Sequence, residues 1–514
     1  MTQHANLDCI IVGPSELDFR TVEKNLRSMG ENSAAFRVLK ANSVLYKGTR
    51  LTYMEMLNAL LEETTGHPHH LYVCELPSLA VCHLKSYLNL HGLQTDFINF
   101  FPYEKKKLLD LLSQLPKAVA ITTTFYVDNS PIIEIVDFVR QHSPQTKIIV
   151  GGPHIMNICA GYDEQAQDFI FQTIGADVYI HDSQGELTLS KLLHHLRNEN
   201  QNLSKIPNLI YSNGDKKFNR TQRIVESNPI DKSIVNWQLF DSDYFLPTVQ
   251  MRTARSCSFS CSFCQYPLLG GPVSLNDIDI VENQLRFLAE SGVRNIVFID
   301  DTFNVPLPRF KNICRMLIKN KFDFNWFSFF RCANADEEAF DLMWQSGCKG
   351  VFLGIESGDQ TILDGMNKYA KVSKYEEGIR QLKERNIMTF VSLIVGFPGE
   401  TQETVQNTID FIESCAPTFY RAELYYHYTN VPIHQQAEKY GLQGSGYHWK
   451  HNTMDWQEAC NKVDFMYKNI QESLVLPGYM FDFWAIPYLM GKGMSLEQIT
   501  AFVSVAQKAM RQGL

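Results

Sequence analysis

The sequence predicts an α/β protein built from three parts: a Rossmann-like parallel-sheet domain (residues 1–200), a partial (β/α)6 barrel (249–430) and a helical C-terminal region (431–514). Two observations favour this class. Short apolar runs alternate with amphipathic stretches through the first two parts, which is typical of parallel sheets covered by helices. The alternation then stops near residue 430. A polar connector at 201–248 separates the sheet domain from the barrel.

The composition is that of a globular protein without an unusual charge. The 514 residues favour two or three domains, and 45% of them are apolar. Lys and Arg number 47 against 56 Asp and Glu, so the net charge of −9 argues against nucleic acid or an anionic membrane surface as a partner. No apolar run has the roughly 18 residues of a membrane helix, and the first residues are not a basic-then-apolar leader. We therefore expect a cytoplasmic protein with mostly reduced thiols.

The elements of the first part follow from these patterns. Apolar runs predict strands at 7–12, 118–124, 147–150 and 177–180. Amphipathic stretches predict helices at 131–142 and 187–197. Two turns, 151–154 and 182–186, follow predicted strands and fall at the carboxyl edge of the sheet, where open α/β folds bind ligands. Ordinary turn chemistry is the alternative for both.

The barrel elements follow in the same way. The expected strands are 295–300, 324–330, 349–355, 388–396 and 421–427. The expected helices between and before them are 276–291, 307–320, 335–346, 374–385 and 402–414. In such a barrel, chemistry is expected at the carboxyl ends of the strands.

Three of the twelve cysteines form a dense motif. Cys257, Cys261 and Cys264 have C-x3-C-x2-C spacing. A structural zinc site normally has a fourth ligand, usually from a second close pair, and the chain has no second CxxC or CxH pair. Three thiolates instead suit a [4Fe–4S] cluster with one iron left open for a substrate or cofactor. Three incidental packed cysteines are the alternative.

This spacing, with Phe263 directly before the last cysteine, resembles the radical S-adenosylmethionine (SAM) superfamily. The segments DDTFN (300–304), GIESG (354–358) and GFPGET (396–401) follow the second, fourth and fifth strands of the expected barrel and strengthen the resemblance. It implies that SAM binds the open iron and that one electron cleaves it to a 5′-deoxyadenosyl radical, which abstracts a substrate hydrogen. It also implies an external electron donor of the flavodoxin or ferredoxin type.

The resemblance also implies cofactor contacts by motif position. The residues carried over are Phe263, Asp301, Arg331, Glu356, Ser392 and Gly396. Strand-end capping is the alternative for Asp300 and Glu356, and loop packing is the alternative for Phe263.

The first part resembles the amino-terminal half of radical SAM enzymes with a cobalamin-binding domain, through GGPHIMN (151–157) and DSQGELTLSKLL (182–193). Methyltransferases, including a phosphorus-methylating branch, belong to that group. The chain lacks the DxHxxG motif whose histidine would ligate cobalt. His154 could face a corrin or simply cap a turn. Cobalamin is thus a possible cofactor that the sequence does not favour.

The long C-terminal region resembles the radical SAM peptide epimerases that mature proteusin-type ribosomal peptides. This resemblance implies a thiol outside the cluster that returns a hydrogen to the α-carbon. Cys460, after a loop rich in His and Trp, is the candidate catalytic residue, and core packing is its alternative. Cys332, Cys348 and Cys415 are weaker candidates.

Aromatic residues 425–428 end the last predicted barrel strand. They line either a substrate pocket or a packed rim.

Three functions remain open at this level. The leading hypothesis is epimerisation of L- to D-residues in a ribosomal precursor peptide, which would be the partner. The alternative is a cobalamin-dependent radical SAM methyltransferase acting on carbon or phosphorus. The third is an iron–sulfur protein without enzymatic activity.

Overall fold

The computed structural model describes residues 7–199, 202–212, 214 and 217–514. Its contacts divide the chain into two compact units. Unit 1 comprises Met1–Leu17 and Pro77–Tyr244, and unit 2 comprises Asp18–Leu76 and Phe245–Leu514.

This division differs from the expected contiguous domain of residues 1–200. The chain leaves unit 1 after its first strand, and residues 18–76 pack within unit 2. Most of the expected connector stays with unit 1, because its strand β8 (Leu209–Ser212) pairs antiparallel with β7 (Val178–Ile180). Periodicity along the chain shows that a helix has an apolar face, but it does not show which surface that face covers.

Unit 1 is built on a seven-stranded sheet with the order β4-β1-β5-β6-β7-β8-β9. The five parallel strands are β4 (Thr95–Ile98), β1 (Cys9–Val12), β5 (Ala118–Thr122), β6 (Lys147–Gly151) and β7, and β9 (Phe218–Arg220) completes the antiparallel edge. Along the chain the parallel strands follow the flavodoxin-like order 2-1-3-4-5. The strand order reverses between β1 and β5, which is where this topology binds ligands.

Helices cover both faces of this sheet. They are α4 (Leu79–Leu90), α5 (Lys105–Leu112), α6 (Ser130–His142), α7 (Pro153–Gly161), α8 (Glu164–Ile174) and α9 (Glu186–Arg197). In β1, Ile10 and Val12 belong to one buried cluster, whereas Cys9 and Ile11 belong to the other. The strand is therefore apolar throughout, as expected for a strand buried on both faces.

Unit 2 contains a parallel seven-stranded sheet in the order β10-β13-β14-β15-β16-β17-β21. The strands are β10 (Thr248–Met251), β13 (Asn295–Phe298), β14 (Asn325–Phe329), β15 (Cys348–Glu356), β16 (Met388–Val395), β17 (Phe419–Leu424) and the short β21 (Leu474–Val475). The first six strands and the helices that follow them form the partial barrel that the sequence predicts.

The helices that alternate with these strands lie close to their predicted positions. They are α12 (Ile278–Glu290), α13 (Leu307–Asn320), α14 (Glu337–Gln345), α15 (Gln360–Gly365), α16 (Val372–Glu384), α17 (Gln402–Cys415) and α19 (Trp456–Asn469). Each begins after a strand or a short loop, so polar side chains at the strand ends meet along one rim.

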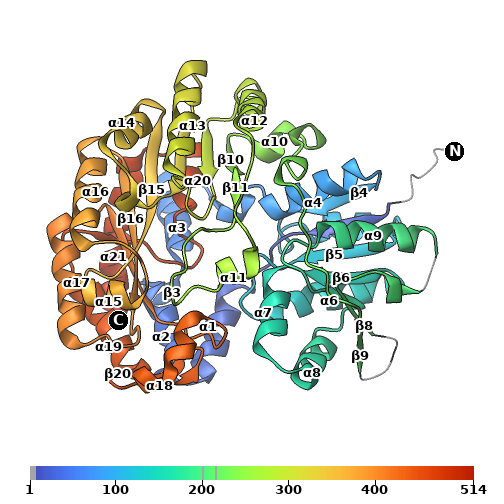
Figure 1. Cartoon of the computed structure of the whole chain (residues 1–514), viewed down its shortest axis with the longest axis horizontal. Coiled ribbons are helices and arrows are strands. Elements are labelled where there is room, and N and C mark those ends of the chain that lie inside the picture. Colours follow the sequence, from blue (N-terminus) through green and yellow to red (C-terminus); the bar gives the residue numbers. More distant parts are fainter. Residues whose placement is uncertain (1–6, 200–201, 213, 215–216) are drawn as a thin grey trace. The chain divides into compact units, whose positions relative to one another are not determined.

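The segment 18–76 and the C-terminal region complete unit 2. The segment supplies α1 (Phe19–Ser28), α2 (Ala34–Ala41), the hairpin β2 (Val44–Tyr46) and β3 (Thr49–Leu51), and α3 (Tyr53–Thr65). The C-terminal region adds α20 (Ala485–Gly491) and α21 (Leu496–Gly513). Figure 1 shows α2 and α3, in blue, beside the orange and red helices α19 and α21.

The C-terminal region is less purely helical than expected. A small antiparallel sheet of β18 (Gln443–Ser445), β19 (His448–His451) and β20 (Met454–Asp455) precedes α19. Its turns use glycines at positive φ, including Gly444 at +83° and Gly446 at +61°. Across the described part of the chain, the helices are too short or too polar to traverse a lipid bilayer.

Candidate iron–sulfur and cofactor site

The cysteine motif lies on a loop between β10 and the short helix α11 (Tyr266–Gly270). Serines between the cysteines fix the loop. The Ser262 amide donates to Met366 O at 2.9 Å and its hydroxyl donates to Gly365 O at 2.9 Å, while its carbonyl accepts from Ile433 N at 2.8 Å. The loop is thus held from α15 and from the segment after β17.

All three cysteines line one cavity of about 200 Å³ at the rim of the barrel. Asp301, Arg331, Glu356 and Lys368 line it as well. Among the described residues, no three His, Cys, Asp or Glu side chains are grouped tightly enough to hold a single metal ion. The three thiols therefore lie around a cavity and do not converge on a single-ion site. This donor set fits a [4Fe–4S] cluster with one iron free of protein ligands.

The thiol of Cys264 is protonated before metal binding. Burial, followed by the neighbouring charges of Cys261 and Cys257, raises its pKa to about 11. Because a cysteine binds iron as a thiolate, cluster assembly at this loop releases protons.

Arg331 supplies an unpaired cation to the same cavity. Its backbone N–H donates to Asn304 Oδ1 at 2.9 Å, and its carbonyl accepts from Asn304 Nδ2 at 3.0 Å. The guanidinium lies 3.7 Å from the centre of the Phe259 ring, but its Nε and Nη2 are buried without a hydrogen-bond partner among the described residues. A buried guanidinium with free N–H groups is suited to an anionic ligand.

Glu356 ends β15 in a strained conformation. Its φ is +70°, and the pairing of β15 with β16 shifts register between Gly354 and Glu356. The Lys368 ammonium lies 3.2 Å from Glu356 Oε1 and donates to Gly354 O at 2.8 Å. Burial raises the pKa of Glu356, and Lys368 opposes that shift. Positive φ in a residue with a side chain is costly and is concentrated at functional sites.

The two aspartates after β13 have different surroundings. Asp300 is buried and accepts hydrogen bonds from Thr253 N at 2.5 Å and Ala254 N at 3.0 Å, so it ties the start of the cysteine loop to the barrel. Asp301 lines the cavity instead. Partial removal from water raises the pKa of Asp301 to about 6, against a hydrogen bond from Tyr266 that lowers it.

The other predicted cofactor residues are dispersed. Phe263 lines the cysteine cavity and a second cavity beside it. Ser392 is buried within β16 and does not line the cysteine cavity. Gly396 has φ of +94°, and a Cβ there would lie 2.4 Å from the Trp449 ring, so this glycine permits close packing of the strand end against β19.

Cys460 lies in the first half of α19 and is buried. It does not line either of these two cavities. Burial raises the pKa of its thiol to about 11, so it carries a hydrogen at neutral pH. Its role as a hydrogen donor stays a prediction.

The sequence analysis missed two residues of the cavity. Lys368 reaches Glu356 from a loop twelve positions further on, and only the fold brings the two together. Phe259 lies inside the cysteine motif, where its position between the ligands was a signal that could have been used.

Unit 1 presents unpaired polar atoms at the carboxyl edge of its sheet. The hydroxyls of Ser15, after β1, and of Thr122, at the end of β5, are buried without partners in the described part of the chain. Ser78, which precedes α4, has a third such hydroxyl and does not use it to cap the helix. All three lie near the point where the strand order reverses.

His154 is the nearest predicted cofactor residue on this edge. It begins α7, and its Nε2 lies 2.8 Å from Asn129 Oδ1. Burial lowers its pKa, so the ring is neutral at pH 7. The side chain already has a protein partner, in agreement with the turn-capping alternative.

The barrel rim thus brings together three thiols with cluster spacing and an arginine whose Nε and Nη2 have no partner among the described residues. Comparison with known proteins identifies the barrel more closely. Residues 251–412 match the radical SAM superfamily, and this part of the chain is a radical SAM domain. It follows an N-terminal region with a flavodoxin-like α/β sheet.

Three relatives and solved structures describe this similarity. The chain is 26% identical over 306 residues to PH0819, an uncharacterized methyltransferase of Pyrococcus horikoshii, which covers 57% of this chain and 62% of the relative. TsrM of Kitasatospora setae, a radical SAM methyltransferase solved with cobalamin and a [4Fe–4S] cluster, matches 72% of this chain and 74% of its own at a TM-score of 0.58 and 19% identity. The radical SAM enzyme OxsB with aqua-cobalamin covers 91% of this chain and 57% of its own, at a TM-score of 0.57 and 13% identity.

The chain therefore spans less than two thirds of the length of PH0819. The two structural matches establish the fold alone. The comparisons give no support to the epimerase hypothesis, and they favour the methyltransferase alternative.

Proposed function

We propose that this protein is a cobalamin-dependent radical SAM methyltransferase. The proposal rests on one observation. The chain contains two sheets with parallel strands, and each sheet has groups suited to ligand binding at its carboxyl edge. One edge holds the cysteine cavity, and the other holds three buried hydroxyls that have no hydrogen-bond partner among the described residues. The methyltransferase relative in Pyrococcus horikoshii and the cobalamin-bound fold of TsrM support the same function.

The residues of unit 1 fit a large ligand held mainly by shape and by neutral polar groups. A Cβ at Gly13 would lie 2.4 Å from Asn99 O, and one at Gly152 would lie 2.8 Å from Thr123 Oγ1, so both glycines keep this edge narrow and closely packed. Phe125 and Val127, in the loop after β5, are 61% and 92% exposed. Exposed apolar side chains beside buried hydroxyls suit an amphipathic corrin. This revises cobalamin from a less favoured cofactor to an expected one.

In unit 2 the proposed contacts to SAM pair each charged residue with a group of opposite charge. Arg331 would hold the carboxylate of SAM through its free N–H groups, and Asp301 would accept its amine. When bound, the cluster at this cavity would supply one-electron reduction of SAM, and cobalamin would supply methyl-transfer chemistry. The surrounding rings of Phe329, Phe330 and Phe352 would keep water out of the cavity. We propose that an external protein of the flavodoxin or ferredoxin type delivers the electron.

The decisive experiment is anaerobic reconstitution with iron, sulfide and hydroxocobalamin. We expect corrinoid to remain with the protein in stoichiometric amount after gel filtration. Ser15→Ala combined with Thr122→Val should weaken corrinoid retention roughly tenfold, because each change removes a buried hydroxyl and leaves the rest of the side chain nearly unchanged. Cluster content should not change, because both residues belong to unit 1.

The opposite outcome is equally clear. A protein that forms the cluster and cleaves SAM to 5′-deoxyadenosine, but never retains corrinoid, is not a cobalamin-dependent methyltransferase. In that case, solvent deuterium at the α-carbon of a peptide, lost in Cys460→Ala, would favour epimerisation.

A further inference from the structure

A second cavity of about 270 Å³ lies beside the cysteine cavity within unit 2. Phe263 lines both cavities. We call this second space the tyrosine cavity. Its lining is Val38, Ala41, Asn42, Phe263, Ile394, Ala422, Glu423, Leu424, Tyr425, Tyr426, Tyr428, Tyr447 and Val463.

Aromatic rings gather at this cavity without forming a closed core. Tyr426 lies with its ring centre 4.7 Å from that of Tyr428 and 4.9 Å from that of Tyr447, which it meets edge to face. Tyr426 is 42% exposed and Tyr428 is 38% exposed. Large rings that remain accessible in a cavity offer their electron-rich faces to a ligand, and such faces attract cations.

Among the described residues that line the tyrosine cavity, Glu423 alone carries a charge, and the described lining contains no Lys, Arg or His. Arg421, two positions earlier on β17, lies outside the lining, with its Nε 3.0 Å from Glu423 Oε1. The Glu423 side chain is 49% exposed, so the carboxylate is accessible.

Tyr447 keeps its phenol proton in this lining. Burial, followed by the charge of Glu423, raises the pKa of the phenol to about 12. The Tyr447 ring thus offers a neutral aromatic face to the cavity.

The segment 18–76 closes the wall of the cavity. Val38 and Ala41 come from α2, and Asn42 caps that helix. The Asn42 carboxamide is already occupied, since it donates to Val38 O at 2.8 Å and accepts from Gly478 N at 2.5 Å. This wall therefore contributes shape and no free charge.

We propose that the tyrosine cavity binds the substrate through a protonated amine, held between the Glu423 carboxylate and the faces of Tyr426, Tyr428 and Tyr447. The substrate class is thus an organic ammonium compound, either a free amine or a lysine-type side chain. The assignment of this ligand as the substrate rests on the proposed function. The ligand is a substrate only if the neighbouring cysteine cavity holds the radical SAM chemistry that would act on it. The binding itself does not require cobalamin, SAM or turnover.

The test measures binding to the full-length protein with its cluster and without SAM. Saturation-transfer-difference NMR would compare n-butylammonium, butan-1-ol and butyrate, which differ mainly in charge. We expect n-butylammonium to bind at least roughly tenfold more tightly than butan-1-ol, and butyrate to bind least. A peptide with one lysine, compared with its acetyllysine form, separates a side-chain source from a free amine.

Two variants and two matched controls locate the site. Glu423→Gln should lower the affinity for n-butylammonium roughly tenfold and leave that for butan-1-ol unchanged. Tyr426→Leu should lower the affinity for the cation while the cluster spectrum stays intact. Glu403→Gln, which also removes one negative charge from an exposed position, and Tyr162→Leu, which also removes an exposed ring, should have no effect.

Equal binding of butan-1-ol and n-butylammonium would overturn the proposal, as would undetectable binding of the cation. Full cation affinity in both Glu423→Gln and Tyr426→Leu would overturn it too. These outcomes are independent of corrinoid retention. The proposed methyltransferase function and this substrate class can therefore fail separately.

Discussion

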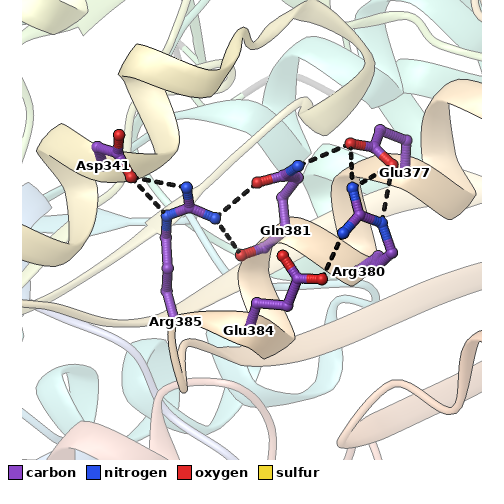
Figure 2. Close-up of polar contacts among 6 residues, drawn as sticks. All are labelled: Asp341, Glu377, Arg380, Gln381, Glu384 and Arg385. Carbon is purple, nitrogen blue, oxygen red and sulfur yellow. Dashed lines mark hydrogen bonds and ion pairs between the residues drawn. The ribbon is translucent and has the colours of Figure 1, made fainter.

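Two polar regions of unit 2 use the same residue types in opposite ways. At the rim of the barrel, Arg331 is buried and its Nε and Nη2 have no protein partner in the described chain. On the outer face of α14 and α16, the arginines are amply paired (Figure 2). The difference separates polar groups that the fold satisfies from polar groups that it leaves for a ligand.

The outer face is a network of ion pairs and amide contacts. Arg385 donates to Asp341 Oδ1 at 2.6 Å and to Gln381 Oε1 at 2.6 Å (Figure 2). Arg380 pairs with Glu377 at 2.7 Å and with Glu384. Their side chains are about half exposed, and exposed pairs of this kind typically contribute about 0–1 kcal/mol each. At the rim the charge lowers the stability of the folded protein instead, because a buried charge without a partner is unfavourable until a ligand neutralises it.

The largest effect should come from the cluster ligands. Cys261→Ala should abolish cluster binding and all formation of 5′-deoxyadenosine from SAM, because two thiolates cannot replace three. Iron per chain and the visible charge-transfer absorption measure cluster binding, and chromatography measures the 5′-deoxyadenosine that is formed. Cys415→Ala, at the end of α17, should retain both. An active Cys261→Ala protein would remove the basis for the assigned cluster.

The Arg331 guanidinium should show opposite effects on stability and binding. Arg331→Met keeps an unbranched apolar stem against Phe259 and removes the unpaired charge. We expect the free energy of unfolding of the ligand-free protein to stay equal or to rise by about 1–3 kcal/mol, while SAM affinity falls roughly tenfold or more. Chemical denaturation and equilibrium dialysis provide the two values. A loss of stability without a loss of affinity would mean that the arginine is structural.

A buried histidine should make unit 2 sensitive to acid. Tyr425 Oη and His434 Nδ1 each lie 3.1 Å from a ring nitrogen of His427, and burial, followed by the charge of His434, lowers the pKa of His427 to about 4. The unfolded chain binds a proton near pH 6.5, so between about pH 6.5 and 4 it holds more protons than the folded chain. Stability should therefore fall as pH falls through this window, by up to about 3 kcal/mol from this residue.

His427→Asn should flatten that part of the pH profile in thermal unfolding. His70→Asn, at an exposed position of the same unit, serves as the control. An unchanged slope in His427→Asn would show that other groups control the acid response.

The smallest effect should come from the outer network. In a double-mutant cycle, Glu384→Gln and Arg380→Gln, whose side chains are about half exposed, should have a coupling energy of about 0.5 kcal/mol, lower at high salt because exposed charges are screened. A coupling above about 2 kcal/mol would contradict the contrast between the two regions, since the paired surface would then be as sensitive as the rim.

Much of the architecture could be predicted because it depends on local patterns. The apolar runs predict β1, β5 and β6, and the alternation predicts five of the six strands of the barrel core, all but β10. The spacing of Cys257, Cys261 and Cys264 predicts them as cluster ligands, and the structure places all three around one cavity. The motif after β13 predicts the region of Asp300 and Asp301, but not that Asp300 ties the loop while Asp301 lines the cavity. The different directions of the Asp300 and Asp301 side chains depend on how the cysteine loop packs against the barrel, which the local sequence does not determine.

The sequence by itself determined that this chain is an α/β protein with three closely spaced thiols at the end of a barrel strand, because strand periodicity and ligand spacing are local properties. Only the tertiary structure decided that residues 18–76 belong with the barrel, that Lys368 reaches Glu356, and that Glu423 and four tyrosines line one cavity together with residues of α2. Those arrangements join segments far apart in the chain. They depend on which apolar faces bury one another and on which buried charges the fold leaves unpaired.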